Sequence, residues 1–464
     1  MKKFLSIILI LSNFSFAQSF LSNKIDSILT SVNGLNQVGI KIIDADSNKT
    51  IYEKNSHLLL SPASTVKLFT TSTALKSLGK NFKLALNFYS TKNPVNGIIN
   101  GDIVIKTFAN PFVKDSTLDS IAVLFNEMGI RKINGNIICD NSYFNKDFIE
   151  EFYGKYQREV ITPPIDAAVI NRNEIRISFI PQQNGKPYNY KIFPKSKFYK
   201  VNFLAKFSKR FHIPRINLDT KPKEISITIK GKIKRSKHTY TFSSFIDNPS
   251  LFIANIFYEK LQTNGIEITG LPKAEKNKNS SYLLFSLPVT LEKIIEKTNK
   301  ESDNFLAEII LNTLGAEFCN CPGNPIEGIN AIKKFLIKNK LPLQEIKLFD
   351  GSGISRKNKF TANAVVELLK TIYDDPENFN TFYSSLASAG LDGTLEERLV
   401  GFGLKNNFHG KTGTLNGISA ISGYLTTLSG KNVILSMIFH FNSHGAEYWR
   451  EIQDEIIVDI TTAY

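Results

Sequence analysis

A serine and a lysine stand three positions apart near the beginning of the chain, at Ser64 and Lys67. Residues at i and i+3 share one face of a helix, so the lysine amine can reach the serine hydroxyl. A serine becomes a useful nucleophile when a base removes its proton, and a lysine can be that base when burial or a second cation lowers its pKa. The pair therefore predicts nucleophilic catalysis through Ser64, although the same spacing recurs at Ser77 and Lys80.

The sequence around this pair predicts the helix that would position it. Ser61 can cap that helix, and Pro62 suits its first position. Gly79 can end the helix after Leu78. Ser64 would then lie in the first turn, where free backbone N–H groups and the helix dipole stabilise developing negative charge.

Two further short motifs follow in order along the chain. Ser302-x-Asn304 opens a predicted helix, and Lys411-Thr412-Gly413 lies in a predicted strand near the end. Each motif is too short to indicate a function alone. In the order S-x-x-K, S-x-N and K-T-G, the three are typical of serine penicillin-recognising acyl transferases and β-lactamases.

The chain resembles the class C low-molecular-mass penicillin-binding proteins, which are serine D-alanyl-D-alanine carboxypeptidase/endopeptidases with a large insertion between the first and second motifs. Here the insertion would lie between Ser64 and Ser302. One departure from the family pattern is Ala109–Pro111, which replaces a turn that usually carries glycine and aspartate. Family-like stretches outside the three motifs are Gly101–Val104, Ala307–Glu308, Asp350–Arg356 and Gly390–Leu395.

The resemblance implies how an acyl-enzyme would form. Ser64 would attack the carbonyl of a penultimate D-alanine while Lys67 takes its proton as general base. Lys411 would be the second cation that helps to lower the pKa of Lys67, so the two amines would titrate as a coupled pair. The backbone N–H groups of Ser64 and Thr414 would form the oxyanion hole.

The resemblance also implies how the substrate would be held. Ser302 would relay a proton to the departing amine, and Asn304 would hold a substrate amide. Water would then hydrolyse the ester, so no cofactor is expected. The terminal carboxylate would bind to Lys411 and to the strand residues that follow it, which are Thr412, Gly413 and Thr414.

Two residues outside the motifs are further candidates for substrate binding. Arg356 ends a glycine-rich stretch, which is also compatible with a plain turn, and we expect its guanidinium to line the cleft and meet a substrate carboxylate. Asp140 ends an apolar, strand-like run and is expected to meet a substrate amine. This pair of opposite charges would suit the zwitterionic end of a diaminopimelate side chain.

The charge of the chain is concentrated in one window. The formal net charge is +15, and residues 181–240 carry most of the excess because Asp219 and Glu224 are their only acids. The predicted export of the chain argues against a nucleic-acid partner. The window therefore predicts either an anionic cell-wall or membrane surface as partner, or a solvated face with no dedicated partner.

The first 17 residues predict a signal peptide. Lys2 and Lys3 precede an apolar run, and Ser15-Phe16-Ala17 is a small-x-small cleavage site. This run is too short to span a bilayer, and no later apolar run reaches about 18 residues, so no transmembrane segment is expected. The mature chain is therefore expected to be exported and periplasmic.

Cysteine and histidine usage gives no metal site. The chain has neither H-E-x-x-H nor clustered His/Cys ligand spacing, so no metal is expected. Cys139 lies in an apolar run and is expected to be a buried thiol. A disulfide bond from Cys139 to Cys319 or Cys321 is an open alternative. With three cysteines in the chain, at least one has no partner within it.

Hydrophobic periodicity predicts an α+β fold. The predicted domains are a signal peptide (1–17), a discontinuous penicillin-binding/β-lactamase-like transpeptidase domain (18–90 and 285–464), an inserted α/β domain (91–171 and 246–284) and a second inserted, basic β-rich domain (172–245). The transpeptidase domain would be an antiparallel sheet flanked by helices and built from both chain ends. Predicted helices cover 19–32, 115–128, 250–264, 290–299, 326–339 and 361–373; predicted strands cover 408–415, 418–427 and 433–441, and 225–234 is predicted as a hairpin.

The predicted function is a serine peptidase that removes D-alanine, or cleaves after it, in peptidoglycan stem peptides and that is inhibited by β-lactams. Two other functions fit part of the pattern. A serine β-lactamase shares the three motifs, but the sequence shows no means of rapid deacylation, and the long insertion is foreign to such enzymes. A cell-wall-binding module with an idle catalytic site would instead use the basic window.

Overall fold

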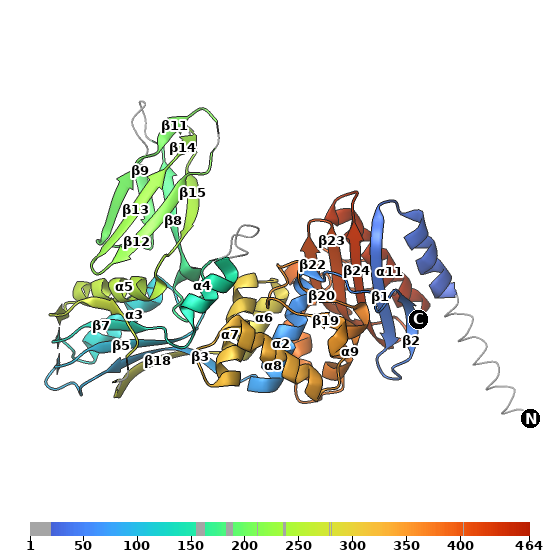
Figure 1. Ribbon diagram of the computed structural model, residues 1–464, viewed down its shortest axis with the longest axis horizontal. Coiled ribbons are helices and arrows are strands. Elements are labelled where there is room, and N and C mark those ends of the chain that lie inside the picture. Colours follow the sequence, from blue (N-terminus) through green and yellow to red (C-terminus); the bar gives the residue numbers. More distant parts are fainter. Residues whose placement is uncertain are drawn as a thin grey trace, which may run out of the picture. The chain divides into compact units, whose positions relative to one another are not determined.

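The chain folds into two compact units (Figure 1). The computed structural model describes residues 20–154, 163–181, 189–210, 212–234, 238–277, 279, 281–401 and 403–464, so the predicted signal peptide lies outside the described residues. One unit, here called the two-ended unit, comprises the chain up to Phe82, Thr290–Cys319 and Pro325–Tyr464. The other, the inserted unit, comprises Lys83–Val289 and Asn320–Asn324.

An antiparallel six-stranded sheet forms the centre of the two-ended unit. Strands from the two chain ends are neighbours in it, since Ile40 of β1 is paired with Met437 of β24. This confirms the predicted sheet built from both ends of the chain. In spatial order, the strands are β2 (Thr50–Lys54), β1 (Leu35–Asp44), β24 (Asn432–Phe441), β23 (Ile418–Thr426), β22 (Phe408–Leu415) and β21 (Ala387–Ser388).

Helices cover both faces of this sheet, which explains why all but the last residue of β23 are buried. A helix over residues 20–31 and α11 (Ala446–Ala463) lie on one face (Figure 1), where Ile25, Trp449 and Ile457 share a core with the sheet. Burial of this apolar surface is the main stabilising term of the unit. The other helices are α2 (Val66–Leu78), α6 (Leu291–Lys300), α7 (Asn304–Cys319), α8 (Pro325–Lys338), α9 (Ala362–Tyr373) and α10 (Phe379–Ser385).

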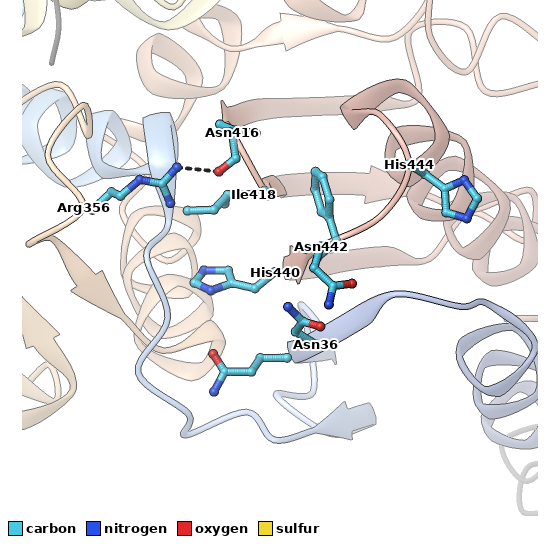
Figure 2. A pocket seen from close by; sticks show the side chains of 10 residues that line it. Asn36, Arg356, Asn416, Ile418, His440, Asn442 and His444 are labelled. Carbon is cyan, nitrogen blue, oxygen red and sulfur yellow. Dashed lines mark hydrogen bonds between the residues drawn. The ribbon is translucent and has the colours of Figure 1, made fainter.

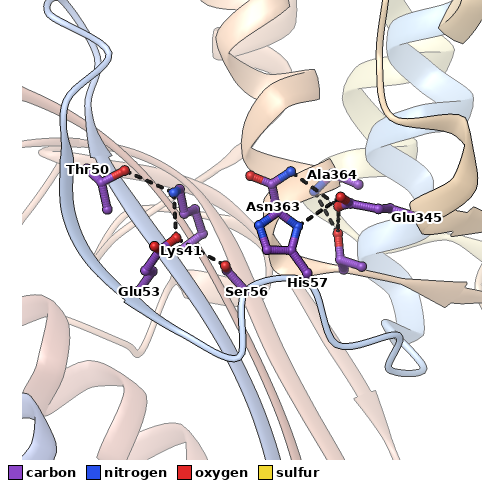
Figure 3. A network of polar contacts seen from close by, with 9 residues as sticks. Lys41, Thr50, Glu53, Ser56, His57, Glu345, Asn363 and Ala364 are labelled. Carbon is purple, nitrogen blue, oxygen red and sulfur yellow. Dashed lines mark hydrogen bonds and ion pairs between the residues drawn. The ribbon is translucent and has the colours of Figure 1, made fainter.

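A polar network joins the sheet edge to the segment before α9 (Figure 3). The Nδ1 atom of His57, in the loop after β2, lies 2.8 Å from Oε1 of Glu345. Asn363 donates its amide to the same carboxylate at 3.2 Å, and the Thr361 hydroxyl donates to it as well. Burial opposes ionisation of Glu345, but these hydrogen bonds hold its pKa below the ordinary value. The loop that precedes α2 is thereby fixed at one end.

The inserted unit is built around a five-stranded sheet and two helices. Its core includes Phe88, Ile105 and Cys139 from the sheet and Phe125 and Phe257 from the helices. The same core contains Ile175, Ile227 and other residues of the basic window's strands, so the structure groups the two predicted inserted domains into one compact unit. The sheet order is β17 (Pro272–Ala274), β7 (Ile137–Asp140), β5 (Ile103–Phe108), β3 (Lys83–Ser90) and β18 (Tyr282–Thr290), and the helices are α3 (Asp115–Glu127) and α5 (Pro249–Thr263).

The predicted hairpin over residues 225–234 is wrong. The strands β13 (Glu224–Lys230) and β14 (Lys232–Lys234) do form, but β13 pairs with β12 (Arg215–Lys221) and β14 pairs with β11 (Lys206–Ser208). The hairpin in this region instead joins β12 to β13 through Pro222 and Lys223, and Lys223 takes the positive φ that such a tight turn requires. Gly231 separates β13 from β14, but the chain does not fold back there to pair these two strands with each other.

The described residues hold few other candidate sites. Cys139 is a buried, free thiol as predicted, and Cys319 and Cys321 are disulfide-bonded. No group of three or more metal-binding side chains occurs in the described part of the chain. Among the same residues, no helix is both long and apolar enough to cross a bilayer.

Candidate active site

Ser64 lies in a short 3-10 turn, Ala63–Thr65, that leads directly into α2. The expected cap is wrong, because the Ser61 hydroxyl is buried without a hydrogen-bond partner among the described residues and Ala63 adopts a left-handed conformation with φ 49°. The close approach of Gly353 accompanies this turn, since a Cβ at Gly353 would lie 2.0 Å from the carbonyl oxygen of Ala63. The turn leaves Ser64 only partly buried, within reach of a ligand.

Lys67 is fully buried, and its Nζ donates to three acceptors from different parts of the chain. These acceptors are Ser64 Oγ at 3.0 Å, Asn304 Oδ1 at 2.7 Å and the carbonyl oxygen of Ser352 at 2.6 Å. The three contacts use all the protons of an ammonium group. The structure thus joins the first motif to the second, and both to a loop that the sequence did not mark as catalytic.

The environment of Lys67 lowers its pKa to about 8. Burial is the main cause, and the carboxylates of Asp350 and Glu308 oppose it. Lys411 is also fully buried, and burial together with the charge of Lys67 holds its pKa well below the ordinary value. Because repulsion between two like charges acts on both groups, the two amines titrate as a coupled pair, and burial is the largest cause of the lowered pKa of each.

The second motif begins α7. Asp303 caps the helix by accepting a hydrogen bond from Leu306 N at 3.0 Å, and Asn304 is its first residue. Ser302 takes a left-handed conformation with φ 56°, and its partly buried hydroxyl forms no hydrogen bond with any described residue. Asn304 is thus brought to Lys67, whereas Ser302 is not bonded to the other motif residues.

The third motif runs along β22, directly against Ser64. A Cβ at Gly413 would lie 2.8 Å from the carbonyl oxygen of Pro62 and 3.0 Å from Ser64 N, so glycine permits this close approach. In the described chain, β21 pairs with β22 only at His409 and Gly410. Beyond them, from Lys411 on, no described strand pairs with this edge of β22, so an extended peptide could be added there.

The hydroxyls of Thr412 and Thr414 have partners of their own. Thr412 donates to Thr394 Oγ1 at 2.8 Å, and Thr414 Oγ1 accepts from Arg450 Nη2 at 3.0 Å. The Nζ atom of Lys411 donates to the carbonyl oxygen of Thr412 at 2.9 Å.

Two buried carboxylates shape the loop beside Lys67, and the sequence reasoning gave neither a role. Glu308 accepts hydrogen bonds from Gly351 N at 3.2 Å and Ser352 N at 2.9 Å. Asp350 accepts from Gly353 N at 2.6 Å within the same loop. One sequence feature could have indicated a role for Glu308: it follows Asn304 by four residues and therefore lies on the same face of the helix.

Arg356 ends this loop and lines a cavity of about 490 Å³ (Figure 2). Its guanidinium donates to the carbonyl oxygen of Asn416, in the turn that follows β22. None of the described residues that line the cavity is acidic, so the cavity would suit an anionic group. The other lining residues are Asn36, Gln37, Gly417, Ile418, His440, Phe441, Asn442 and His444.

Asp140 belongs to the inserted unit and is 1% exposed. Its two oxygens accept hydrogen bonds from Ser142 N at 2.9 Å and Asn277 N at 3.0 Å. The carboxylate thus holds two loops of that unit together, and its proposed contact with a substrate amine gains no support from this geometry.

Comparison with known proteins identifies the family. A model described as the D-Ala-D-Ala carboxypeptidase 3 (S13) family matches residues 21–463. The chain belongs to this family. The match confirms the resemblance to serine D-alanyl-D-alanine carboxypeptidases that the three motifs indicated.

Relatives match over most of the chain. The D-alanyl-D-alanine carboxypeptidase of Actinomadura sp. (strain R39) is 24% identical over 436 residues, which cover 90% of this chain and 80% of that protein. The carboxypeptidase DacB of Haemophilus influenzae is 26% identical over 465 residues, covering 96% and 95%. The crystal structure of penicillin binding protein 4 (dacB) from H. influenzae matches with a TM-score of 0.76 at 22% identity, over 93% of this chain and 99% of that one. This likeness confirms the fold class of this S13 family member.

Proposed function

We propose that this S13 family member cleaves after D-alanine in peptidoglycan stem peptides through an acyl-enzyme on Ser64, as a D-Ala-D-Ala carboxypeptidase, a DD-endopeptidase or both. The observation that supports this proposal is the contact of Lys67 Nζ with Ser64 Oγ at 3.0 Å. At a pKa of about 8, a useful fraction of the Lys67 amine is neutral near pH 7 and can accept the serine proton.

Acylation would begin when Lys67 takes the proton of Ser64 as its oxygen attacks the carbonyl carbon. Negative charge would develop on the carbonyl oxygen, next to the N–H groups of Ser64 and Thr414. The C–N bond would then break, and the departing amine would receive a proton through Ser302, whose hydroxyl is otherwise unbonded in the described chain. Attack by water on the ester would regenerate Ser64, with Lys67 again as base.

The substrate peptide would lie along the open edge of β22. Asn304, whose Oδ1 accepts from Lys67, would present its NH₂ group to a substrate carbonyl. Further along, Arg356 would meet a carboxylate on the side chain of the diamino acid, because it lines a cavity without acids next to the end of β22. Arg356→Ala should then reduce turnover of diaminopimelate peptides more than turnover of peptides with acetylated lysine.

Incubation with purified muropeptides, followed by mass spectrometry, tests the activity. Loss of one alanine from pentapeptides indicates a carboxypeptidase, and cleavage of cross-linked dimers indicates an endopeptidase. Ser64→Ala is the matched control and should yield neither product. Absence of both products with the wild-type chain would contradict the proposal.

β-Lactam labelling separates this function from the other two. A peptidase should form a penicilloyl adduct on Ser64 that lasts for hours, whereas a β-lactamase would release it within seconds. A wall-binding module with an idle site would not be labelled at all.

We also propose that residues 1–17 direct export to the periplasm and that the basic window docks on an anionic cell-wall or membrane surface. Lys209, Arg210, Lys230 and Lys232 are exposed there. Replacing these four by serine should abolish salt-sensitive sedimentation with purified sacculi, because electrostatic attraction between exposed charges is screened by salt. Unchanged sedimentation would contradict the docking proposal.

A further inference from the structure

The leaving amino acid of the proposed reaction carries a carboxylate, and the site needs a cation for it. Lys411 is poorly suited to this task. It is fully buried, and its Nζ donates to the carbonyl oxygen of Thr412. Burial lowers the pKa of Lys411, so its charged form is disfavoured at this position. A permanently charged group at the same strand edge would therefore strengthen carboxylate binding.

Arg450 is a permanently charged side chain that reaches the open edge of β22. It lies in α11, on the sheet face that the side chains of Thr412 and Thr414 share, and its Nη2 donates to Thr414 Oγ1 at 3.0 Å. Thr414 is exposed and Arg450 is partly exposed. Within the described part of the chain, Arg450 forms no direct ion pair, although its charge also acts on Asp454, which is paired with Arg398.

The neighbouring arginine is different. Arg398 donates to both oxygens of Asp454, at 2.6 and 3.1 Å, and also to the carbonyl oxygen of Arg450 at 3.2 Å. Arg398 thus stabilises the helix that presents Arg450, and its own charge is paired. This leaves Arg450 as the guanidinium free to bind a ligand.

We propose that Arg450, together with the Thr414 hydroxyl, binds the α-carboxylate of the leaving D-amino acid. This inference rests on the proposed peptidase function. The N–H group of Arg450 occupies a lone pair of Thr414 Oγ1, so the Thr414 proton turns outward and can be donated to the carboxylate. A second N–H group of the guanidinium can reach the same anion, which gives a charge-assisted pair of donors. The substrate class is therefore a peptide whose leaving residue keeps a free carboxylate beside the scissile amide.

Four kinetic measurements test the inference. Wild type and Arg450→Gln are each assayed with a peptide ending in D-Ala-D-Ala and with the same peptide ending in a carboxamide. For the free acid, we expect Arg450→Gln to lower kcat/KM by about 10- to 100-fold, mostly through KM, because the contact exists in both the ground state and the transition state. For the carboxamide, we expect less than about a threefold change, since no charge is lost there. Arg450→Lys should restore part of the selectivity for the acid.

The control variant is Lys24→Gln, which removes an ion pair with Asp459 of the same helix and should leave the ratio between the two peptides unchanged. Equal losses on both peptides with Arg450→Gln would overturn the inference and leave Arg450 as a purely structural residue. If Arg450→Gln does not fold, Arg450→Met, which also removes the charge, gives the same comparison. Wild type that cleaves neither peptide would overturn the proposed function and the inference with it, whereas equal losses would leave the proposed function intact.

Discussion

The chemistry of the site depends on one buried amine held by three acceptors. Burial lowers the pKa of Lys67 to about 8 against the opposing charges of Asp350 and Glu308. The same acids keep the ammonium form stable enough to be buried at all, because an unpaired buried charge would be very costly. Burial thus favours the neutral amine, which could act as a base, while the two carboxylates favour the ammonium form.

The pH dependence of acylation follows from this balance. The base must be neutral, so the second-order rate of acylation by penicillin should rise about tenfold per unit up to pH 8 and level off above it. Stopped-flow measurements between pH 6 and 9.5 check this profile. Lys67→Arg, which cannot lose its proton, should reduce the rate by about 100- to 10,000-fold at every pH. A flat wild-type profile would exclude Lys67 as the base.

Glu308 should tune that profile. Its carboxylate raises the pKa of Lys67, so Glu308→Gln should move the midpoint of the profile to lower pH. Glutamine keeps one acceptor for the N–H groups of Gly351 and Ser352, and the loss of the other should cost about 1–3 kcal/mol of stability. The pH profile and the unfolding midpoint are measured on the same variant. A destabilised variant with an unmoved profile would show that Glu308 only supports the loop.

At this scale, the sequence predicted the motif side chains better than the groups that tune them. Ser64, Lys67 and Asn304 are joined by hydrogen bonds as the motifs suggested. The hydrogen bond from Lys67 to the carbonyl oxygen of Ser352 could not be predicted, because every residue has a backbone carbonyl and the residue type therefore gives no signal. The loop of Gly351 and Ser352 is also brought to Glu308 only by the tertiary fold.

Among the elements, β22 determines the geometry of the site because it lies directly against the 3-10 turn that carries Ser64. The predicted strand over 408–415 was correct, since alternation and flanking turns are local signals. Its short distance from Ser64 depends on the tertiary fold. The only local sign of it in the third motif is Gly413, whose role could not be inferred from the sequence. The wrong hairpin at 225–234 has the same origin, because strand pairing depends on partners far along the chain.

Gly413→Ala tests this close approach. The new Cβ would lie 2.8 Å from the carbonyl oxygen of Pro62, so β22 or the turn of Ser64 must move. A displacement near 1 Å at a reacting group can cost about 100-fold in rate, and we expect at least that loss in penicillin acylation. Gly445→Ala is the matched control, because nothing lies within 4 Å of its added Cβ and its φ is −81°. Similar acylation rates in both variants would show that the approach is not required.

At the scale of the whole molecule, the sequence predicted the discontinuous architecture but not its borders. Motifs at both ends of the chain required one domain made from both, and β1 beside β24 confirms it. The border at Phe82 ends the short turn between α2 and β3, and the border at Val289 lies within β18, so no long linker marks either of them. The division of the insertion into two domains stays a prediction, since isoleucines from both predicted parts share one core.

The inserted unit has its own expected pH dependence, which originates at Asp166. This carboxyl is 1% exposed, and burial raises its pKa to about 6 although Asn141 and Ala168 N each donate to it at 2.9 Å. A raised pKa means that the folded state binds the proton more tightly than the unfolded state does. The stabilisation is therefore complete below about pH 4 and is lost as the pH rises through about 6.

Hydrogen exchange can localise this effect. Between pH 4 and 7 the inserted unit should lose up to about 3 kcal/mol from this one group, as reported by exchange of the β5 and β7 amides after correction for intrinsic rates. Asp166→Asn keeps the acceptor oxygen for Ala168 N but cannot titrate, so the free energy of opening should become nearly independent of pH in this range. Amides of β23 and β24 provide the internal control, because Asp166 and its hydrogen-bond partners all belong to the inserted unit. If the wild type and Asp166→Asn showed the same pH dependence at β5 and β7, the titrating group would have to be another one.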